Sequence, residues 1–263
     1  MRLKLLLAYT GTRYHGWQIQ EKPNPPLTVQ GELEAALGKI AGRPVRVCGS
    51  GRTDAGVHAK GQTAHCDVPV AKEIDWRRSL NALLPRDIRV IRADAVRPDF
   101  HARNDAAQKT YHYQFWQERN FCPPELLPFV WPCGPLDVEA MRAALPHLAG
   151  RRDFAVFRNA GADGGSTCRT VFSVELTPLP PQEHYPPHRP ALCFSVTADG
   201  FLKQMVRNMA GLLVACGRKR IDPRLVPKFL DARDRAALPS PTAPACGLTL
   251  VSVDYRSGHS FHS

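Results

Sequence analysis

Gly49-Ser50-Gly51-Arg52-Thr53-Asp54-Ala55-Gly56-Val57-His58 is the stretch around which the rest of the chain can be interpreted. It follows Val45 to Cys48, which predicts a short strand, and it surrounds one carboxylate with glycines. Because glycine permits tight turns and close approach of backbone to a ligand, Asp54 is a candidate site residue. The alternative is a plain turn in which Asp54 bonds local amides. The stretch is neither a Walker A loop nor a G-x-G-x-x-G fingerprint, since Asp54 replaces the third glycine.

Helices and strands alternate on both sides of this loop. Before it, Leu3 to Thr10 predicts a strand, and Val29, Leu33, Leu37 and Ile40 recur at helical spacing between the cap Thr28 and the stop Gly42. Beyond it, the pattern predicts strands at 62–68, 88–95, 110–116, 170–176, 192–197 and 248–255, and helices at 76–84, 138–148 and 202–216. In 110–116 the residues Tyr111, Tyr113 and Phe115 share one face.

This alternation of helices and strands predicts an α+β fold of two similar lobes, residues 1–104 with the Asp54 loop and residues 105–263. Each lobe is expected to be a largely antiparallel sheet with helices on one face, and a central cleft between lobes is the default site.

The composition narrows the classes of partner. The chain has 263 residues with 35 Lys+Arg and 24 Asp+Glu, a net charge of +11, and 43% apolar residues. The charge favours an anionic partner, nucleic acid first, and the apolar fraction excludes wholesale disorder. Residues 1–104 carry 17 basic and 10 acidic residues and the remainder 18 and 14, so the excess is not a basic tail.

The compartment can be argued from cysteines and from apolar runs. The eight cysteines contain no C-x-x-C pair, which is typical of reduced thiols. The longest apolar stretch, Met209 to Cys216, is far short of a membrane span, and the short apolar run at Leu5 to Ala8 lacks the features of a signal peptide. We therefore expect a cytoplasmic protein with no membrane span.

Six segments in order resemble the tRNA pseudouridine synthase A (TruA) family. The Asp54 stretch is similar to the family's signature, in which the Asp is catalytic. The other five are Tyr9-Thr10-Gly11-Thr12-Arg13-Tyr14-His15-Gly16-Trp17-Gln18, Phe100-His101-Ala102-Arg103, Lys109-Thr110-Tyr111-His112-Tyr113, Gly200-Phe201-Leu202 with Met205-Val206-Arg207-Asn208, and Gly247-Leu248-Thr249-Leu250. The sequence departs from the family at two places. Thr10 stands where the family usually has Asp, which bears on a loop contact. Asn104-Asp105 replaces a more typical Phe/Ser-like pair, which bears on RNA contacts there.

The resemblance implies an isomerase that converts uridine to pseudouridine at positions 38 to 40 of the tRNA anticodon stem-loop. The reaction is redox-neutral and needs no ATP, so we expect no cofactor. The resemblance also implies a homodimer whose partner is tRNA.

The resemblance assigns catalysis to three residues. Asp54 either attacks the substrate covalently or abstracts a ribose proton to give a glycal intermediate, and both routes remain open. Arg207 pairs with Asp54, since its fork suits a carboxylate and its apolar helix neighbours make an unpaired charge costly. Tyr111 stacks on the target uracil. Without the family, Arg207 as an exposed helix arginine and Tyr111 as core packing are the competing interpretations.

Five further residues are expected to contact RNA: Arg52, His58, His101, Arg103 and Lys203. Arg52 is a candidate wedge for the space that a flipped nucleotide leaves, or else a surface ion pair; His101 has a structural alternative. His65 and Cys66 point to opposite faces of a strand, so a metal site with His58 is not expected.

Two other classes of function compete: an RNA-binding protein without chemistry, and an Asp-dependent phosphoesterase. The intact trio Asp54, Tyr111 and Arg207 argues against the first. The second usually needs several carboxylates that hold metal ions, and no carboxylate pair lies near Asp54.

Overall fold

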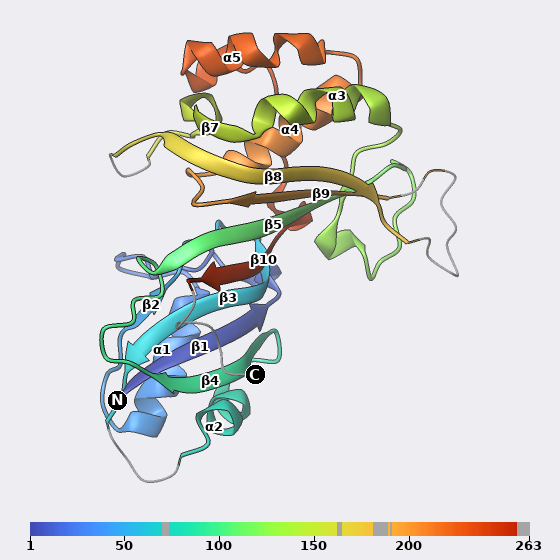
Figure 1. Cartoon of the computed structure of the whole chain (residues 1–263). Coiled ribbons are helices and arrows are strands. Elements are labelled where there is room, and N and C mark those ends of the chain that lie inside the picture. The colour runs from blue at the N-terminus through green and yellow to red at the C-terminus, as the bar shows by residue number, and fades with distance from the viewer. Residues whose placement is uncertain (70–73, 162–164, 181–188, 190, 257–263) are drawn as a thin grey trace. The chain divides into compact units, whose positions relative to one another are not determined.

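The computed structural model describes residues 1–69, 74–161, 165–180, 189 and 191–256, which form an α+β protein (Figure 1). The chain divides into two compact units. Unit 1 contains residues 1–109 and the C-terminal residues from 250, and unit 2 contains residues 110–249. The expected lobes met between residues 104 and 105 and kept the C-terminal strand in the second lobe, so the units differ from them at both places.

Unit 1 is an antiparallel sheet accompanied by two helices. Its elements are β1 (Arg2–Tyr9), α1 (Val29–Ala41), β2 (Val47–Gly49), β3 (His58–Asp67), α2 (Trp76–Leu83), β4 (Ile88–Val96), the start of β5 (Ala106–Trp116) and most of β10 (Leu248–Tyr255). The strand order is β4–β1–β3–β10, and β2 pairs with β3. Strand β1 runs antiparallel to both β3 and β4. The sheet type predicted for this part of the chain is confirmed.

The caps predicted for the first helix are confirmed. The Thr28 side chain accepts a hydrogen bond from the Gly31 backbone N–H, and Gly42 follows the helix with a left-handed φ of +67°. The hydroxyl satisfies one of the amides left unpaired in the first turn, and glycine adopts the left-handed conformation at little cost. Helix α1 therefore begins and ends where its sequence requires.

The end of β10 belongs to unit 1, where β10 pairs with β3, and its aromatic residue makes further contacts there. The Tyr255 hydroxyl donates to the Ala102 carbonyl at 2.7 Å. The Lys4 ammonium, fully buried on β1, lies 4.2 Å from the Tyr255 ring centroid and 5.1 Å from that of Phe100. A buried ammonium needs such compensation. These contacts tie a strand more than 240 residues along the chain to the first strand.

Among its described residues, unit 2 has its own antiparallel strands and three α-helices. Its elements are the remainder of β5, β6 (Trp131–Pro132), α3 (Val138–Leu148), β7 (Gly150–Asp153), β8 (Cys168–Pro178), β9 (Leu192–Ala198), α4 (Met205–Gly217), α5 (Val226–Ala232) and the start of β10. The strand order is β5–β9–β8–β7, with β6 parallel to β5. Strand β8 is antiparallel to β7 and β9.

Two patterns in unit 2 agree with the sequence. Tyr111, Tyr113 and Phe115 of β5 are all buried, as the alternation predicts. In α4 every residue except Arg207 is buried, so this helix is a core element rather than a surface one. Helix α3 packs against both α4 and β8. Among the residues that the structure describes, no helix combines the length and the apolar character that crossing a membrane requires.

Candidate functional site

Asp54 lies on the connection between β2 and β3, which pair as neighbouring antiparallel strands. The Val57 N–H donates to the Asp54 carbonyl at 3.1 Å, which closes a four-residue turn. Gly56 occupies its third position with φ +79°, as a type II turn requires. The turn is closed through the Asp54 backbone, and Asp54 as a residue is partly exposed.

Segment 9–17, the first family-like motif, holds the loop from one side. The Tyr9 hydroxyl and the Thr53 hydroxyl are 2.9 Å apart, and burial raises the pKa of Tyr9 to about 12, which keeps its proton in place. The Trp17 N–H donates to the Thr53 carbonyl at 3.1 Å, and the Gly56 N–H donates to Tyr14 at 3.3 Å. The residue before Asp54 and the turn after it are therefore fixed by a segment about forty residues earlier in the chain.

Glycines make this contact possible. A Cβ on Gly11 would lie 2.0 Å from the Val57 carbonyl oxygen, and one on Gly16 would lie 2.5 Å from that of Thr53. A Cβ on Gly49 would meet the Trp17 ring at 2.7 Å. Real Cβ atoms do not approach other atoms so closely, so these glycines are required by close packing of backbone on backbone and of backbone on the indole ring.

A second set of hydrogen bonds braces the start of the loop. The Ser50 hydroxyl donates to Gln62 at 2.7 Å, and the Gln62 amide nitrogen donates to the Gly51 carbonyl at 3.0 Å. The Lys109 ammonium donates to the Ser50 carbonyl at 2.7 Å. Gln62 was not among the residues predicted from the sequence; the available signal was a glutamine between the small residues Gly61 and Thr63.

The residues expected to contact RNA in unit 1 differ in exposure. Arg52 and Arg103 are exposed. His58 is 2% exposed, and its Nδ1 accepts a hydrogen bond from the Gly11 N–H at 3.1 Å. The structure thus places His58 inside the unit, where it supports the loop; it differs here from the RNA contact expected from sequence, because the ring has no accessible face.

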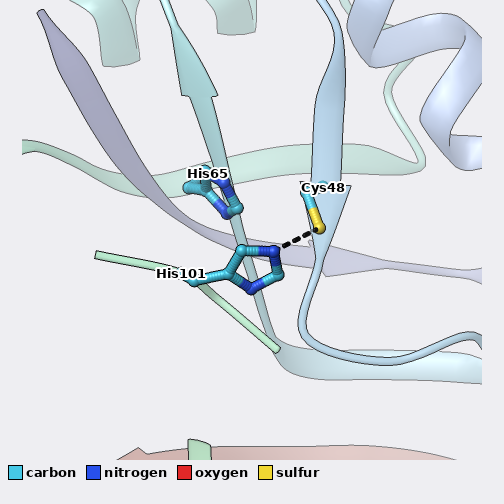
Figure 2. A group of neighbouring side chains, drawn as sticks. All are labelled: Cys48, His65 and His101. Atoms are coloured by element: carbon cyan, nitrogen blue, oxygen red, sulfur yellow. Dashed lines mark hydrogen bonds between the residues drawn. The ribbon is translucent and has the colours of Figure 1, made fainter. Parts of the chain in front are cut away.

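The side chain of His101 lies beside those of Cys48 and His65 (Figure 2). Their potential ligand atoms lie within 4.8 Å of one another, and the Cys48 sulfur is 3.8 Å from His101 Nε2. Burial, followed by the charge of His101, lowers the pKa of His65 to about 4. From the sequence, Cys66 was the cysteine weighed as a metal ligand together with His65. Their side chains point to opposite faces of β3, and the cysteine beside His65 is Cys48 of the paired strand β2.

The backbone around these two rings decides what the cluster can bind. His65 Nδ1 accepts from the Ala102 N–H at 3.1 Å, and His101 Nδ1 accepts from the N–H groups of Arg103 and Asn104 at 3.2 Å. A neutral imidazole that accepts at Nδ1 carries its proton on Nε2. A metal-binding histidine instead donates through its second nitrogen. His101 Nε2 is therefore set to donate toward the Cys48 sulfur, which supports the expectation that no metal binds here; that expectation stays a prediction.

In unit 2, Tyr111 lies on β5 with 8% of its surface exposed. Its ring meets Phe201 edge to face, with centroids 5.1 Å apart and planes at 85°. Phe201 belongs to the same family-like segment as Arg207, so the packing links two of the motifs found in the sequence. Such a pair fixes the plane of the tyrosine ring.

Arg207 lies in the first turn of α4 and is anchored through its backbone and side chain. Its Nε donates to the Ala243 carbonyl at 2.8 Å, and the Ala243 N–H donates back to the Arg207 carbonyl at 3.2 Å. The segment that carries Ala243 packs closely on the helix, since a Cβ on Gly211 would lie 2.0 Å from the Pro241 oxygen. The Nε contact turns the guanidinium and leaves its two Nη groups to other interactions.

Lys203 precedes this helix and is exposed. Its ammonium donates to the carbonyls of Ala160 at 2.8 Å and Gly161 at 3.3 Å. The structure thus brings Tyr111, Lys203 and Arg207 into unit 2, and Asp54, Arg52, His58, His101 and Arg103 into unit 1. The predicted pair of Asp54 with Arg207 joins residues of different units and stays a prediction.

Comparison with known proteins agrees with these motifs. Residues 6–105 and 144–256 match the family model described as tRNA pseudouridine synthase. A protein named tRNA pseudouridine synthase A from Oleidesulfovibrio alaskensis is 51% identical over 97% of this chain and 96% of its own length. Proteins of the same name from Lawsonia intracellularis and Moorella thermoacetica are 49% and 41% identical, over 97% and 96% of this chain and 99% of each relative.

The matched region contains both the Asp54 loop and the segment that supports it, as well as Arg207 at the start of α4. With relatives at these identities over nearly the whole chain, the protein belongs to the tRNA pseudouridine synthase A family, isomerases that convert uridine to pseudouridine in the tRNA anticodon stem-loop.

Proposed function

We propose that this protein isomerises uridine to pseudouridine at positions 38 to 40 of the tRNA anticodon stem-loop, with Asp54 as the residue that starts the reaction. The observation that carries the proposal is the loop itself. Its Asp54 backbone forms the turn while Thr53 and Gly56 are fixed by segment 9–17, so the carboxylate is held in a defined place on a rigid support. Pre-positioning of the reacting group is what such a reaction needs.

The reaction conserves all atoms. The bond between C1′ and N1 breaks, the uracil turns, and C1′ bonds to C5; the proton lost from C5 is balanced by one gained at N1. No oxidant, reductant or phosphoryl donor takes part. Asp54 acts either by covalent attack or by removal of a ribose proton, and both routes require an ionised carboxylate.

Arg207 pairs with Asp54 in this proposal and orients it. Arginine keeps its proton at all relevant pH values and offers paired N–H donors that match a carboxylate. The bond from Nε to Ala243 supports the role because it fixes the direction of the guanidinium. Arg207 is also the one residue of α4 that is not buried, and all the other residues of this helix lie in the core.

Tyr111 stacks on the flipped uracil, and its edge-to-face packing on Phe201 supports a fixed ring plane. Arg52, Arg103 and Lys203 contact the RNA backbone, in keeping with their exposure. Arg52 also serves as the wedge that fills the space left by the flipped nucleotide. We leave His58 out of the RNA contacts because it is buried, and His101 supports the backbone of residues 103 and 104.

The protein acts in the cytoplasm as a homodimer in which each tRNA contacts both subunits. The location follows from the substrate and agrees with cysteines that are all unpaired among the residues that the structure describes. The dimer is tested by the mass in solution at micromolar concentration. A dimeric mass is expected, and a monomer with full activity would contradict it.

One experiment tests the activity. The protein is incubated with unmodified tRNA in the presence of a chelator, and pseudouridine is measured by mass spectrometry. We expect product from the native protein, none from Asp54→Ala, and the same tRNA affinity for both. The matched control is Asp99→Ala, which removes a carboxylate whose ion pair with Arg97 is exposed and worth little.

Three outcomes would contradict the proposal. Tight tRNA binding without product from the native protein would indicate an RNA-binding protein without this chemistry. Product from Asp54→Ala at the native rate would remove Asp54 from its role. Loss of activity with the chelator alone would favour metal-dependent chemistry, as in a phosphoesterase.

A further inference from the structure

Unit 2 contains an open cavity of about 720 Å³ that none of the candidate site residues lines. It is bordered by the chain after β5, the start of α3 and the end of α4. Five cationic side chains line it, namely Arg119, Arg189, Arg218, Lys219 and Arg220, against two acidic ones, Asp137 and Glu139.

Both acidic residues already have cationic or backbone partners. Asp137 caps α3 by accepting from the Ala140 N–H at 3.1 Å, and the Lys219 ammonium is 3.2 Å from its carboxylate. Glu139 accepts from Arg142 at 2.7 Å. Lys219 is therefore neutralised by Asp137, and the four arginines remain.

Two of the four arginines are held by carbonyl groups rather than by carboxylates. Arg218 Nη2 donates to the Cys133 carbonyl at 2.6 Å, and Arg189 Nη1 donates to that of Leu136 at 3.3 Å. Within residues 1–69, 74–161, 165–180, 189 and 191–256, none of the four arginines has a carboxylate partner. Carbonyls orient a guanidinium but do not balance its charge.

Arg218 is the one arginine of these four that is not exposed. Its Nε is buried and has no hydrogen-bond partner among the described residues, while its guanidinium lies 5.9 Å from the Trp131 ring centroid. Burial, with the charges of Arg119 and Arg220, lowers the pKa of Arg218. A partly desolvated cation without a counter-charge is costly, and an anion in the cavity would recover that cost.

Helix geometry explains only part of this cluster. Cations after the last turn of α4 are favoured by the partial negative charge of a helix C-terminus, which accounts for Arg218 to Arg220 in general terms. Arg119 follows β5, and its side chain lies over Gly134, where a Cβ would approach within 2.7 Å of Nε. Convergence of separate segments on one cavity is a feature of a binding site.

We propose that this cavity binds phosphate groups of the RNA backbone, an inference that rests on the proposed function for its choice of anion. Guanidinium forks match phosphate oxygens in pairs, and a row of backbone phosphates offers several such groups. Arg207 and Arg218 are separated along the α4 axis by about 16 Å, taking about 1.5 Å per residue. The cavity therefore holds a part of the RNA away from the nucleotide next to Arg207.

The test compares two double variants that each remove two positive charges from unit 2. Arg119→Ala with Arg220→Ala removes cavity residues whose side chains make no hydrogen bond among the described residues, so folding is expected to be unaffected. Arg151→Ala with Lys228→Ala removes cations outside the cavity. Affinity for unmodified tRNA is measured by filter binding at several salt concentrations, together with thermal unfolding and turnover.

We expect the cavity variant to bind tRNA about tenfold more weakly than the control variant. Its slope of log affinity against log salt should fall by about one for each arginine that meets a phosphate. Turnover at saturating tRNA should not change. Equal affinity and slope for the two variants, with equal unfolding midpoints, would overturn the proposal.

A second measurement separates RNA from small anions. Phenylglyoxal modifies accessible arginines, and mass spectrometry locates the modified residues. Unmodified tRNA should protect Arg119 and Arg220 in the native protein, and inorganic pyrophosphate at the same phosphate concentration should not. Protection by pyrophosphate alone would overturn the assignment to RNA. If the native protein binds tRNA without forming pseudouridine, the proposed function fails. The binding and protection results still decide whether the cavity binds RNA phosphates.

Discussion

Gly16 is the residue whose replacement should move Asp54 with the least chemical change. It has φ +89°, and a Cβ would lie 2.5 Å from the Thr53 carbonyl oxygen. We predict that Gly16→Ala forces segment 9–17 away from the loop and lowers kcat by roughly 100-fold, since a displacement of about 1 Å at a reacting group has effects of that size. The measurement is pseudouridine formed per unit time at saturating tRNA.

Gly42→Ala is the matched control for Gly16→Ala. Gly42 also has a left-handed φ, +67°, but no atom lies within 4 Å of the position that a Cβ would take there. Alanine at this position carries the same kind of backbone strain, about 1 kcal/mol, without a collision. If both variants lose activity equally, strain or instability and not the contact with Thr53 is responsible.

His65 should make the stability of the protein depend on pH in the acid range. Burial, with the charges of His101 and Arg2, lowers its pKa from 6.5 to about 4 in the folded state. Between these values the unfolded state binds more protons, so the free energy of unfolding rises with pH from 4 to 6.5 and is lost as pH falls. We predict a loss of about 1–3 kcal/mol across this window, measured by urea unfolding.

His65→Asn isolates that contribution. Its Oδ1 takes the place of Nδ1 as acceptor for the Ala102 N–H, and it does not titrate. The variant should show a flatter pH dependence than the native protein between pH 4 and 6.5. The same slope in both proteins would assign the acid sensitivity to other groups.

At the residue scale, motifs in the sequence predict Asp54, Arg207 and Tyr111 as site residues, and that stays a prediction; the residues that support the Asp54 loop could not be predicted from the motifs. Gln62 and Tyr9 brace the loop by hydrogen bonds across strands, and such pairs depend on register. His58 looked like a polar residue near a site, yet it faces inward to the Gly11 N–H. A single sequence gives alternation along a strand but not which neighbour the face will meet.

At the scale of elements, helices were predicted best because their ends have local causes. Helix α1 keeps the predicted caps. Helix α4 begins at Met205 rather than near Leu202, because Gln204 has φ +61° and ends the preceding turn. The return of β10 to unit 1 could not be predicted, since it depends on contacts such as that of Tyr255 with Lys4 between distant strands.

Helix α4 also supports a prediction about how Arg207 is positioned. A Cβ on Gly211 would lie 2.0 Å from the Pro241 oxygen, so the helix and the segment 241–243 meet backbone to backbone. Gly211→Ala should separate them, break the Arg207–Ala243 contacts and destabilise the protein by about 1–3 kcal/mol. Both unfolding free energy and kcat should fall, measured by urea unfolding and by pseudouridine formation.

Gly38→Ala in α1 is the control for a glycine within a helix. Its Cβ would have one ordinary contact, 3.5 Å from the Arg43 oxygen. Alanine has the higher helix propensity, so this variant should be more stable by up to about 1 kcal/mol with unchanged kcat. A neutral or stabilising Gly211→Ala with native activity would show that the 241–243 segment does not position Arg207.

At the scale of the whole molecule, the excess of positive charge belongs to both units' sequences and not to a tail. Unit 1 has 19 basic and 12 acidic residues, a net charge of +7, and unit 2 has 16 and 12, a net charge of +4. Exposed Arg52 and Arg103 lie in unit 1, and the arginine cavity lies in unit 2. A folded tRNA presents many phosphates, so binding should use many weak contacts instead of one strong site.

That distribution predicts a steep dependence of tRNA affinity on salt. A protein that meets about 6–10 phosphates loses roughly 10³–10⁵ in affinity between 50 and 200 mM salt, because released counterions favour binding at low salt. We expect KM for tRNA to rise steeply over this range while kcat at saturating tRNA stays nearly constant, since the roles proposed for Asp54 and Arg207 follow binding. In the double variant Arg119→Ala with Arg220→Ala, KM for tRNA should rise less steeply with salt than in the native protein. A flat response of KM in the native protein would mean that the basic surfaces do not hold the RNA, and a parallel fall in kcat would place a salt-sensitive step in the chemistry instead.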